Sequence, residues 1–229
     1  MDTPVNRFVR LLTSRHRVVA IGGLAVIAHG NPRKTKDADI WLEPMASARQ
    51  WADALSSACG KFGGLELLRL PDWLSVRGDA LVEAVDDAGM VRIGGLDCPL
   101  DVFRKPNEAE LTDFEGYHRR GRLRDDGTVL PHPLDLIETK LNTDRERDFT
   151  DILFLESLVR AEYAERLPTA TPEEAAAMLH RFSDWQVLRV ALTNPHAAVQ
   201  DLARSHLEEF AEAGDPFSQA ILAGREIPG

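Results

Sequence analysis

Asp37 and Asp39 stand one residue apart in the stretch "KDADIWLE", whose apolar residues are typical of a buried β-strand. Side chains alternate along a strand, so both carboxylates project from one face and Ala38 from the other. Two carboxylates held close together repel each other, and burying either without a partner is costly. A divalent cation with a preference for oxygen ligands relieves this repulsion, so the spacing predicts a Mg²⁺ site.

A glycine pair upstream could supply a phosphate site next to this cation. Gly22 and Gly23 follow the β-branched run "RVVAI", which predicts a strand, a tight turn and a short helix. Backbone N–H groups in such a turn can approach phosphate closely. Arg33, Lys34 and Lys36 add positive charge, and the combination predicts binding of a nucleoside triphosphate with Mg²⁺. Without the glycine pair, an isolated Asp-x-Asp would favour a solvated turn.

A third carboxylate is expected beside the first two. Asp101 lies within "LDVF", a second apolar strand that could pair with the strand carrying Asp37 and Asp39. Three carboxylates on one sheet face would form a two-metal phosphoryl-transfer site, with metals about 3.5–4 Å apart. Asp97 is the rival third acid, but it closely follows Gly94-Gly95 and is interpreted as a solvated turn residue.

Strands and helices must alternate to position these residues. Hydrophobic spacing predicts helices over 4–15, 24–30, 46–60, 107–120, 133–141 and 145–163, and strands over 17–21, 37–43 and repeatedly within 65–105, including "DALVEAV". From Thr169 the chain becomes helical, with helix starts expected at Thr171, Asn194 and Asp215. We predict an α+β fold with a mixed sheet flanked by helices (1–166) and an all-α region (167–229).

Composition and charge restrict the class of protein. The 229 residues are 44% hydrophobic and 28% charged, with a net charge of −10 that argues against broad nonspecific nucleic-acid binding. No apolar run approaches the ~20 residues that cross a bilayer, and the N-terminus does not read as a signal peptide. Two cysteines form neither a disulfide framework nor a metal motif, so a cytoplasmic location without membrane association is expected.

The glycine turn, the Asp-x-Asp and the later strand aspartate together resemble the nucleotidyltransferase superfamily typified by DNA polymerase beta. Within that superfamily, "GGLAVIAHGNPRKTKDADIW" and "PLDLIETKLNTDRERDFTDI" are similar to small bacterial nucleotidyltransferase-like proteins related to abortive-infection and toxin–antitoxin systems. The resemblance covers residues 15–160. It implies a mixed-sheet nucleotidyltransferase core and activity on an NTP with Mg²⁺.

The resemblance also assigns roles. It makes Gly22 and Gly23 the phosphate turn, Asp37 and Asp39 the metal ligands, and Asp101 the third ligand that helps to activate the attacking hydroxyl. Further matches are Arg33 and Thr35 in an "R-x-T-x-D-x-D" pattern, with Lys36 adjacent, and Lys140, Arg145, Asp148 and Asp151 in a downstream helical pattern. One departure is Gly23, which stands where many active members have serine.

Several residues keep two interpretations. Lys140 could reach a phosphate as part of the catalytic set, or pair with Glu138 or Asp144 in solvent. Arg145, Asp148 and Asp151 are interpreted as structural ion pairs, with Asp148 orienting Lys140. The arginine-rich segment 117–124 could hold the phosphates of an RNA acceptor, with its tyrosine stacking on a base, or form a solvated surface. The four tryptophans are assigned to core or interface positions.

The predicted function is Mg²⁺-dependent transfer of a nucleoside monophosphate from an NTP to a hydroxyl of RNA or protein, within a toxin–antitoxin or phage-defence system. One alternative is a non-catalytic antitoxin or scaffold with the same fold that acts by binding a partner protein. A further alternative is an antibiotic nucleotidyltransferase, because an acidic surface could bind a cationic aminoglycoside.

Overall fold

The chain folds into two compact units, Met1–Leu155 and Glu156–Gly229, in a computed structural model that describes residues 3–106, 109–141 and 145–225. The first unit contains a mixed β-sheet with helices, and the described part of the second unit is helical. The predicted α+β fold class is therefore confirmed. The boundary between units falls inside helix α7 (Glu146–Arg166), and the domain division at 166/167 stays a prediction.

The sheet of the first unit has seven strands in its described part, in the order β3-β4-β5-β2-β1-β7-β6. The strands are β1 (Val18–Ile21), β2 (Ala38–Leu42), β3 (Glu66–Leu68), β4 (Met90–Gly94), β5 (Leu100–Phe103), β6 (Arg122–Leu123) and β7 (Val129–Leu130). Strand β2 runs antiparallel to β1 and parallel to β5. The predicted strands that carry the site aspartates are thus neighbours at the centre of the sheet.

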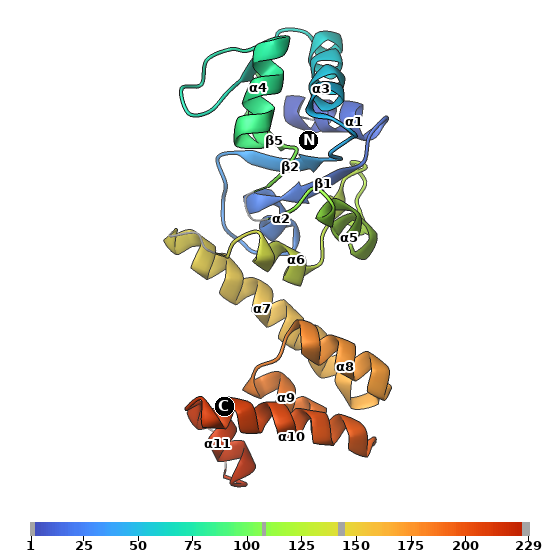
Figure 1. Cartoon of the computed structure of the whole chain (residues 1–229), viewed down its shortest axis with the longest axis vertical. Helices are drawn as coiled ribbons and strands as arrows, with labels where there is room; N and C mark the ends of the chain where they lie inside the picture. The colour runs from blue at the N-terminus through green and yellow to red at the C-terminus, as the bar shows by residue number, and fades with distance from the viewer. Residues whose placement is uncertain (1–2, 107–108, 142–144, 226–229) are drawn as a thin grey trace. The chain divides into compact units, whose positions relative to one another are not determined.

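Helices cover the two faces of this sheet differently (Figure 1). Helices α1 (Pro4–Thr13), α3 (Ala48–Phe62) and α4 (Asp79–Ala88) pack on one face against Val18, Ile40, Leu42, Val91 and Val102. On the opposite face lies α5 (Asp113–Arg120), with α2 (Gly22–Ala28) and α6 (Pro133–Glu138) on the same side. Because side chains alternate along strands, Asp39 shares this second face with Trp41.

Residues 79–88 differ from the prediction, which placed a strand there. They form α4, in which Leu81, Ala84 and Val85 face the core at helical spacing. Gly89 ends the helix in the left-handed conformation, with a φ of 67°. A short apolar run is ambiguous between strand and helix, and the glycines at either end marked helix limits here. Within 107–120, the helix occupies Asp113–Arg120, and residues 107–108 lie outside the described residues.

The second unit contains α8 (Pro172–Arg181), α9 (Trp185–Ala191), α10 (Ala197–Glu212) and α11 (Pro216–Leu222), after a 3₁₀ turn at Leu167–Thr169. Thr171 and Asp215 cap α8 and α11 as predicted. Asn194 was expected to be a cap, which is wrong. Its buried side-chain amide donates to the carbonyls of Leu167 and Ala170, at 2.6 and 2.9 Å. Among the described helices, none combines the length and apolarity that crossing a membrane requires.

Trp41 anchors the face of the sheet that carries Asp39. Its indole is fully buried, packs edge-on against Phe114 and Tyr117, and donates a 2.9 Å hydrogen bond from Nε1 to the Arg104 carbonyl. The tryptophan assignment to the core is confirmed for Trp41 and for Trp51, whereas Trp73 is 40% exposed.

Replacing Trp41 by alanine should therefore lower the free energy of unfolding by about 3–5 kcal/mol, because a large cavity and an unpaired carbonyl remain. Urea unfolding followed by circular dichroism measures the change. Leu123→Ala removes a side chain that is 72% exposed and should change the free energy by less than about 0.5 kcal/mol. Equal losses in the two variants would contradict this account of the core.

Candidate active site

A cavity of about 650 Å³ opens on the sheet face that carries Asp39. Its walls combine the glycine turn, the ends of the central strands and the start of α7. The lining residues are Gly22, Gly23, Arg33, Thr35, Asp37, Asp39, Leu70, Trp73, Met90, Arg92, Asp101, Phe103, Lys140, Arg145, Glu146, Arg147 and Asp148. The tertiary structure thus brings together every predicted site residue except Lys36, which is exposed and does not line the cavity.

Strand pairing places the carboxylates side by side. Asp39 and Asp101 are register partners in the parallel pairing of β2 with β5, so both project toward the cavity. Asp37 precedes β2 by one residue, and its Oδ1 accepts a 2.8 Å hydrogen bond from the Thr35 hydroxyl. Asp97, the rival third acid, is exposed, and its Oδ1 accepts the Val5 N–H at 2.8 Å near the start of α1. The strand placement of Asp101 is confirmed, and Asp97 is the turn residue that was expected.

The glycine turn touches Asp39 directly. Gly22 has a φ of +60°, and a Cβ added there would lie 2.0 Å from Oδ2 of Asp39. The backbone N–H of Gly23 favours the charged form of the same carboxylate and so lowers its pKa. A side chain at position 22 is therefore excluded by both backbone conformation and space. The turn predicted to hold phosphate also supports the aspartate predicted to hold the cation.

Gly23 is required by its neighbours. A Cβ at this position would lie 2.8 Å from Oγ1 of Thr35 and 2.9 Å from Nη2 of Arg33. A serine at position 23 would therefore require the Arg33 or Thr35 side chain to shift. The departure from the common serine form follows from this local packing, and bears on contacts to phosphate only through the missing hydroxyl.

The Asp39 carboxyl sits in an environment that disfavours its charge. Burial raises its pKa to about 7, helped by the negative charges of Asp37 and Asp101, while the Gly23 N–H and Lys140 oppose the shift. An ionised Asp39 therefore destabilises the folded protein unless positive charge approaches. This is the property expected of a cation ligand.

Asp101 is engaged by an arginine that the sequence analysis did not single out. Arg92 Nε and Nη2 donate to the two carboxylate oxygens at 2.6 and 2.7 Å. The guanidinium also lies over the Trp73 ring, 4.1 Å from its centroid. A signal existed in the sequence, because Arg92 is a single charge within the apolar strand "MVRI". Its partner could be found only from the antiparallel register of β4 and β5.

A buried ionic network includes three residues that line the cavity, Arg33, Lys140 and Asp148. Asp151 is fully buried and accepts from Arg33 Nε and Nη2 at 2.7 and 2.8 Å. Lys140 Nζ lies 2.8 Å from Asp151 and 2.7 Å from Asp148. The network joins the loop before β2 to the first turns of α7. Its cations are paired because an isolated buried charge would be strongly unfavourable.

These contacts settle the competing interpretations of the helical residues. Lys140 is 6% exposed, so the interpretation of it as a solvated lysine is wrong. The alternative pairing with Asp144 stays a prediction, because Asp144 lies outside the described residues. The orienting contact from Asp148 is present. Asp148 and Asp151 form structural ion pairs as expected, but with Lys140 and Arg33, and Arg145 lines the cavity.

The donor set suits a hard cation at Asp37 and Asp39. Both supply carboxylate oxygens to the cavity, and Asp39 is held in a site where its charge lacks compensation. Asp101 differs, because both of its oxygens bind Arg92. Consistent with that pairing, no group of three histidine, cysteine or acidic side chains is arranged to hold a metal ion in the described ranges. Carboxylate oxygens at Asp37 and Asp39 suit Mg²⁺, and Asp101 as a third ligand stays a prediction.

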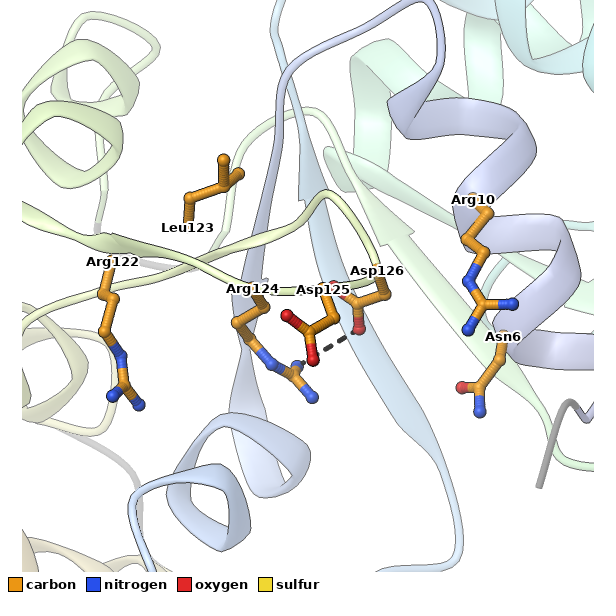
Figure 2. A pocket seen from close by; sticks show the side chains of 7 residues that line it. All are labelled: Asn6, Arg10, Arg122, Leu123, Arg124, Asp125 and Asp126. Atoms are coloured by element: carbon orange, nitrogen blue, oxygen red, sulfur yellow. Dashed lines mark ion pairs between the residues drawn. The ribbon is translucent and has the colours of Figure 1, made fainter.

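The arginine-rich segment 117–124 does not line the cavity that contains Asp37 and Asp39. Tyr117 is buried at 3% exposure and donates from its hydroxyl to Glu138 at 2.8 Å, so base stacking by this ring is wrong. Arg122 and Arg124 line a separate cavity of about 450 Å³ with Arg10 of α1 (Figure 2). There Arg124 is paired with Asp126 at 3.5 Å. This second cavity includes none of the predicted site residues.

Comparison with known proteins adds little to this geometry. No protein-family model matches the chain, and no curated protein is significantly similar to it in sequence. Among solved structures, JHP933 from Helicobacter pylori is 13% identical, with a TM-score of 0.38 and coverage of 90% of this chain and 92% of its own. An H. pylori protein provisionally assigned as a nucleotidyltransferase is 14% identical, with a TM-score of 0.37 and coverage of 89% and 93%.

The packing around Gly23 makes a stability prediction. Gly23→Ser should lower the free energy of unfolding by about 1–3 kcal/mol, because the new Cβ displaces Arg33 or Thr35. Gly60→Ser is the matched control, since nothing lies within 4 Å of a Cβ at that helical position. Thermal melting measures both variants. An unchanged melting temperature in Gly23→Ser would contradict the packing argument.

The pKa of Asp39 makes a prediction about pH. A carboxyl whose pKa is raised by folding keeps its proton longer in the folded state, so its contribution to stability is lost as pH rises from about 4 to about 7. Asp39→Asn removes this loss and, with a chelator present, should stabilise the protein by about 2–4 kcal/mol more at pH 8 than at pH 4.5. Asp87→Asn, at an exposed position, should show no such difference. If Asp39→Asn changes the free energy of unfolding equally at both pH values, the raised pKa of Asp39 is refuted.

Proposed function

We propose that the protein is a Mg²⁺-dependent nucleotidyltransferase that transfers a nucleoside monophosphate from an NTP to a hydroxyl group. The observation that carries this proposal is the contact between the Gly22–Gly23 turn and Asp39 on the wall of one cavity. The turn, whose backbone phosphate could approach closely, is thereby adjacent to the carboxylate oxygens that could bind a cation. Phosphoryl transfer needs this pairing, because its catalysis is mainly positioning and charge neutralisation.

Asp37 and Asp39 would hold the cation. When bound, Mg²⁺ would neutralise phosphate charge and polarise the phosphorus–oxygen bonds. Thr35 orients Asp37 through its 2.8 Å hydrogen bond, and the Gly23 N–H favours the charged form of Asp39. The Thr35 hydroxyl and the two glycines therefore influence the cation ligands Asp37 and Asp39 as well as the space available for phosphate.

The remaining residues divide the work of positioning. Arg33 is held by Asp151 and packs close to Gly23 of the glycine turn, while Lys140 brings buried positive charge to the cavity wall. Arg145 and Arg147 line the same cavity from the start of α7 and offer charge to a triphosphate. Lys36, which lies away from the lining, has no direct role in this scheme.

In the reaction, the acceptor oxygen forms a bond to the α-phosphorus as the bond to pyrophosphate breaks. The hydroxyl proton passes to a carboxylate, for which Asp101 is the candidate once Arg92 releases it. The acceptor is a hydroxyl of RNA or protein, and a toxin–antitoxin or phage-defence partner is the setting that we propose. The antibiotic acceptor is less favoured, because arginines and lysine surround the acids of the cavity.

The test is Mg²⁺-dependent label transfer from each of the four α-³²P-labelled NTPs, with thermal shift as a measure of binding. Wild-type protein should be stabilised by NTP with Mg²⁺ and should transfer label. Asp39→Asn should lose at least about 100-fold of the transfer rate, because a cation ligand is removed.

Asp87→Asn is the matched control, since it removes one exposed carboxylate outside the cavity. It should bind NTP and transfer label as wild type does. Equal transfer by wild type and Asp39→Asn would refute the assignment. Absence of any thermal response to all four NTPs would instead favour a non-catalytic module that binds a partner protein.

A further inference from the structure

A bidentate ion pair engages the third acid of the cavity. Arg92 and Asp101 face each other across β4 and β5 and form two parallel hydrogen bonds of 2.6 and 2.7 Å. Paired, charge-assisted contacts of this kind are among the strongest in proteins. Both Asp101 oxygens therefore accept from Arg92, whose positive charge opposes the approach of a cation to Asp101.

The Arg92 guanidinium supplies positive charge to the three acids in place of a metal cation. The pKa of Arg92 is raised, first by its hydrogen bond to Asp101, with additional contributions from the charges of Asp37 and Asp39. One positive side chain therefore interacts with all three acids. Its side chain is 25% exposed, so it borders open space in the cavity and could move into it.

Trp73 contacts the Arg92 guanidinium through its ring. Its ring lies 4.1 Å from the Arg92 Cζ, a cation–π distance, while the indole itself is 40% exposed. The backbone of Trp73 has a φ of 56°, which is unfavourable for a bulky residue. Hydrogen bonds from Trp73 N to Arg69 O (2.9 Å) and from Arg69 N to Leu74 O (3.0 Å) maintain this conformation.

We propose that Arg92 is a positioning residue that controls whether Asp101 can join Asp37 and Asp39 around a divalent cation, with Trp73 keeping Arg92 in place. The proposal rests on the proposed function, because it concerns the same cation. In the paired arrangement the site offers two carboxylates. Release of Arg92 toward the phosphates of a bound nucleotide supplies the third, so that cation and nucleotide binding complete the site together.

Mn²⁺ binding, measured by electron paramagnetic resonance on the full chain without nucleotide, tests this coupling independently of turnover. Arg92→Gln should bind Mn²⁺ about tenfold more tightly than wild type, because a carboxylate is freed and a competing charge removed. Trp73→Ala keeps every charge and should tighten binding about two- to threefold, because the guanidinium loses its cover. Adding Asp101→Asn to Arg92→Gln should cancel the gain.

Arg120→Gln is the matched control. Arg120 also binds an aspartate through two nitrogens, with Nη2 2.8 Å from Oδ1 of Asp135, and lies over Tyr117, but it is outside the cavity lining. Its loss should leave Mn²⁺ affinity within about twofold of wild type. This comparison separates release of Asp101 from a general effect of removing an arginine.

The possible results distinguish the two proposals. If wild type binds Mn²⁺ and Asp39→Asn weakens it, but Arg92→Gln and Trp73→Ala have no effect, the role of Arg92 is refuted and the cation site stands. If no variant binds Mn²⁺, both proposals fail. If Arg92→Gln does not fold, Trp73→Ala decides: tighter binding supports the role of Arg92, and unchanged binding overturns it.

Discussion

The contact between Gly22 and Asp39 is the constraint on which the rest of the site depends. Antiparallel pairing of β1 with β2 makes Ile21 and Asp39 partners, so the chain must turn immediately beside the carboxylate. Only a residue without a side chain fits there, since a Cβ would lie 2.0 Å from the carboxylate oxygen. The absence of a side chain at Gly22 leaves the backbone accessible beside the Asp39 carboxylate. Phosphate and a cation bound together require this arrangement.

Charge balance then determines how the surrounding elements are placed. The acids on β2 and β5 face one arginine from β4, and a second network of Arg33, Lys140, Asp148 and Asp151 ties the loop before β2 to α7. Asp39 differs from these paired groups, because burial and the charges of Asp37 and Asp101 raise its pKa to about 7. The negative charge of Asp39 is therefore incompletely neutralised, and a positively charged ligand would bind favourably there.

Gly23 illustrates how local packing and chemistry are linked. Its missing side chain leaves room for Thr35 and Arg33, which in turn orient Asp37 and bind Asp151. A serine hydroxyl at position 23 could contact phosphate, but it would displace the residues that hold the acids and the turn. The glycine form is therefore internally consistent with the Arg33 and Thr35 side chains, and its presence is not a defect of an otherwise serine-based site.

Local sequence predicted those candidate site residues whose placement follows short-range rules. Alternation along a strand placed Asp37 and Asp39 on one face, and the Gly22–Gly23 pair marked the turn, because both patterns are set by neighbouring residues. Tertiary structure alone decided which charges meet. The pairing of Arg92 with Asp101 depends on strand register, and the burial of Tyr117 and Lys140 depends on helices distant in sequence. The helix at 79–88 likewise required the core, because a short apolar run satisfies either periodicity until it packs.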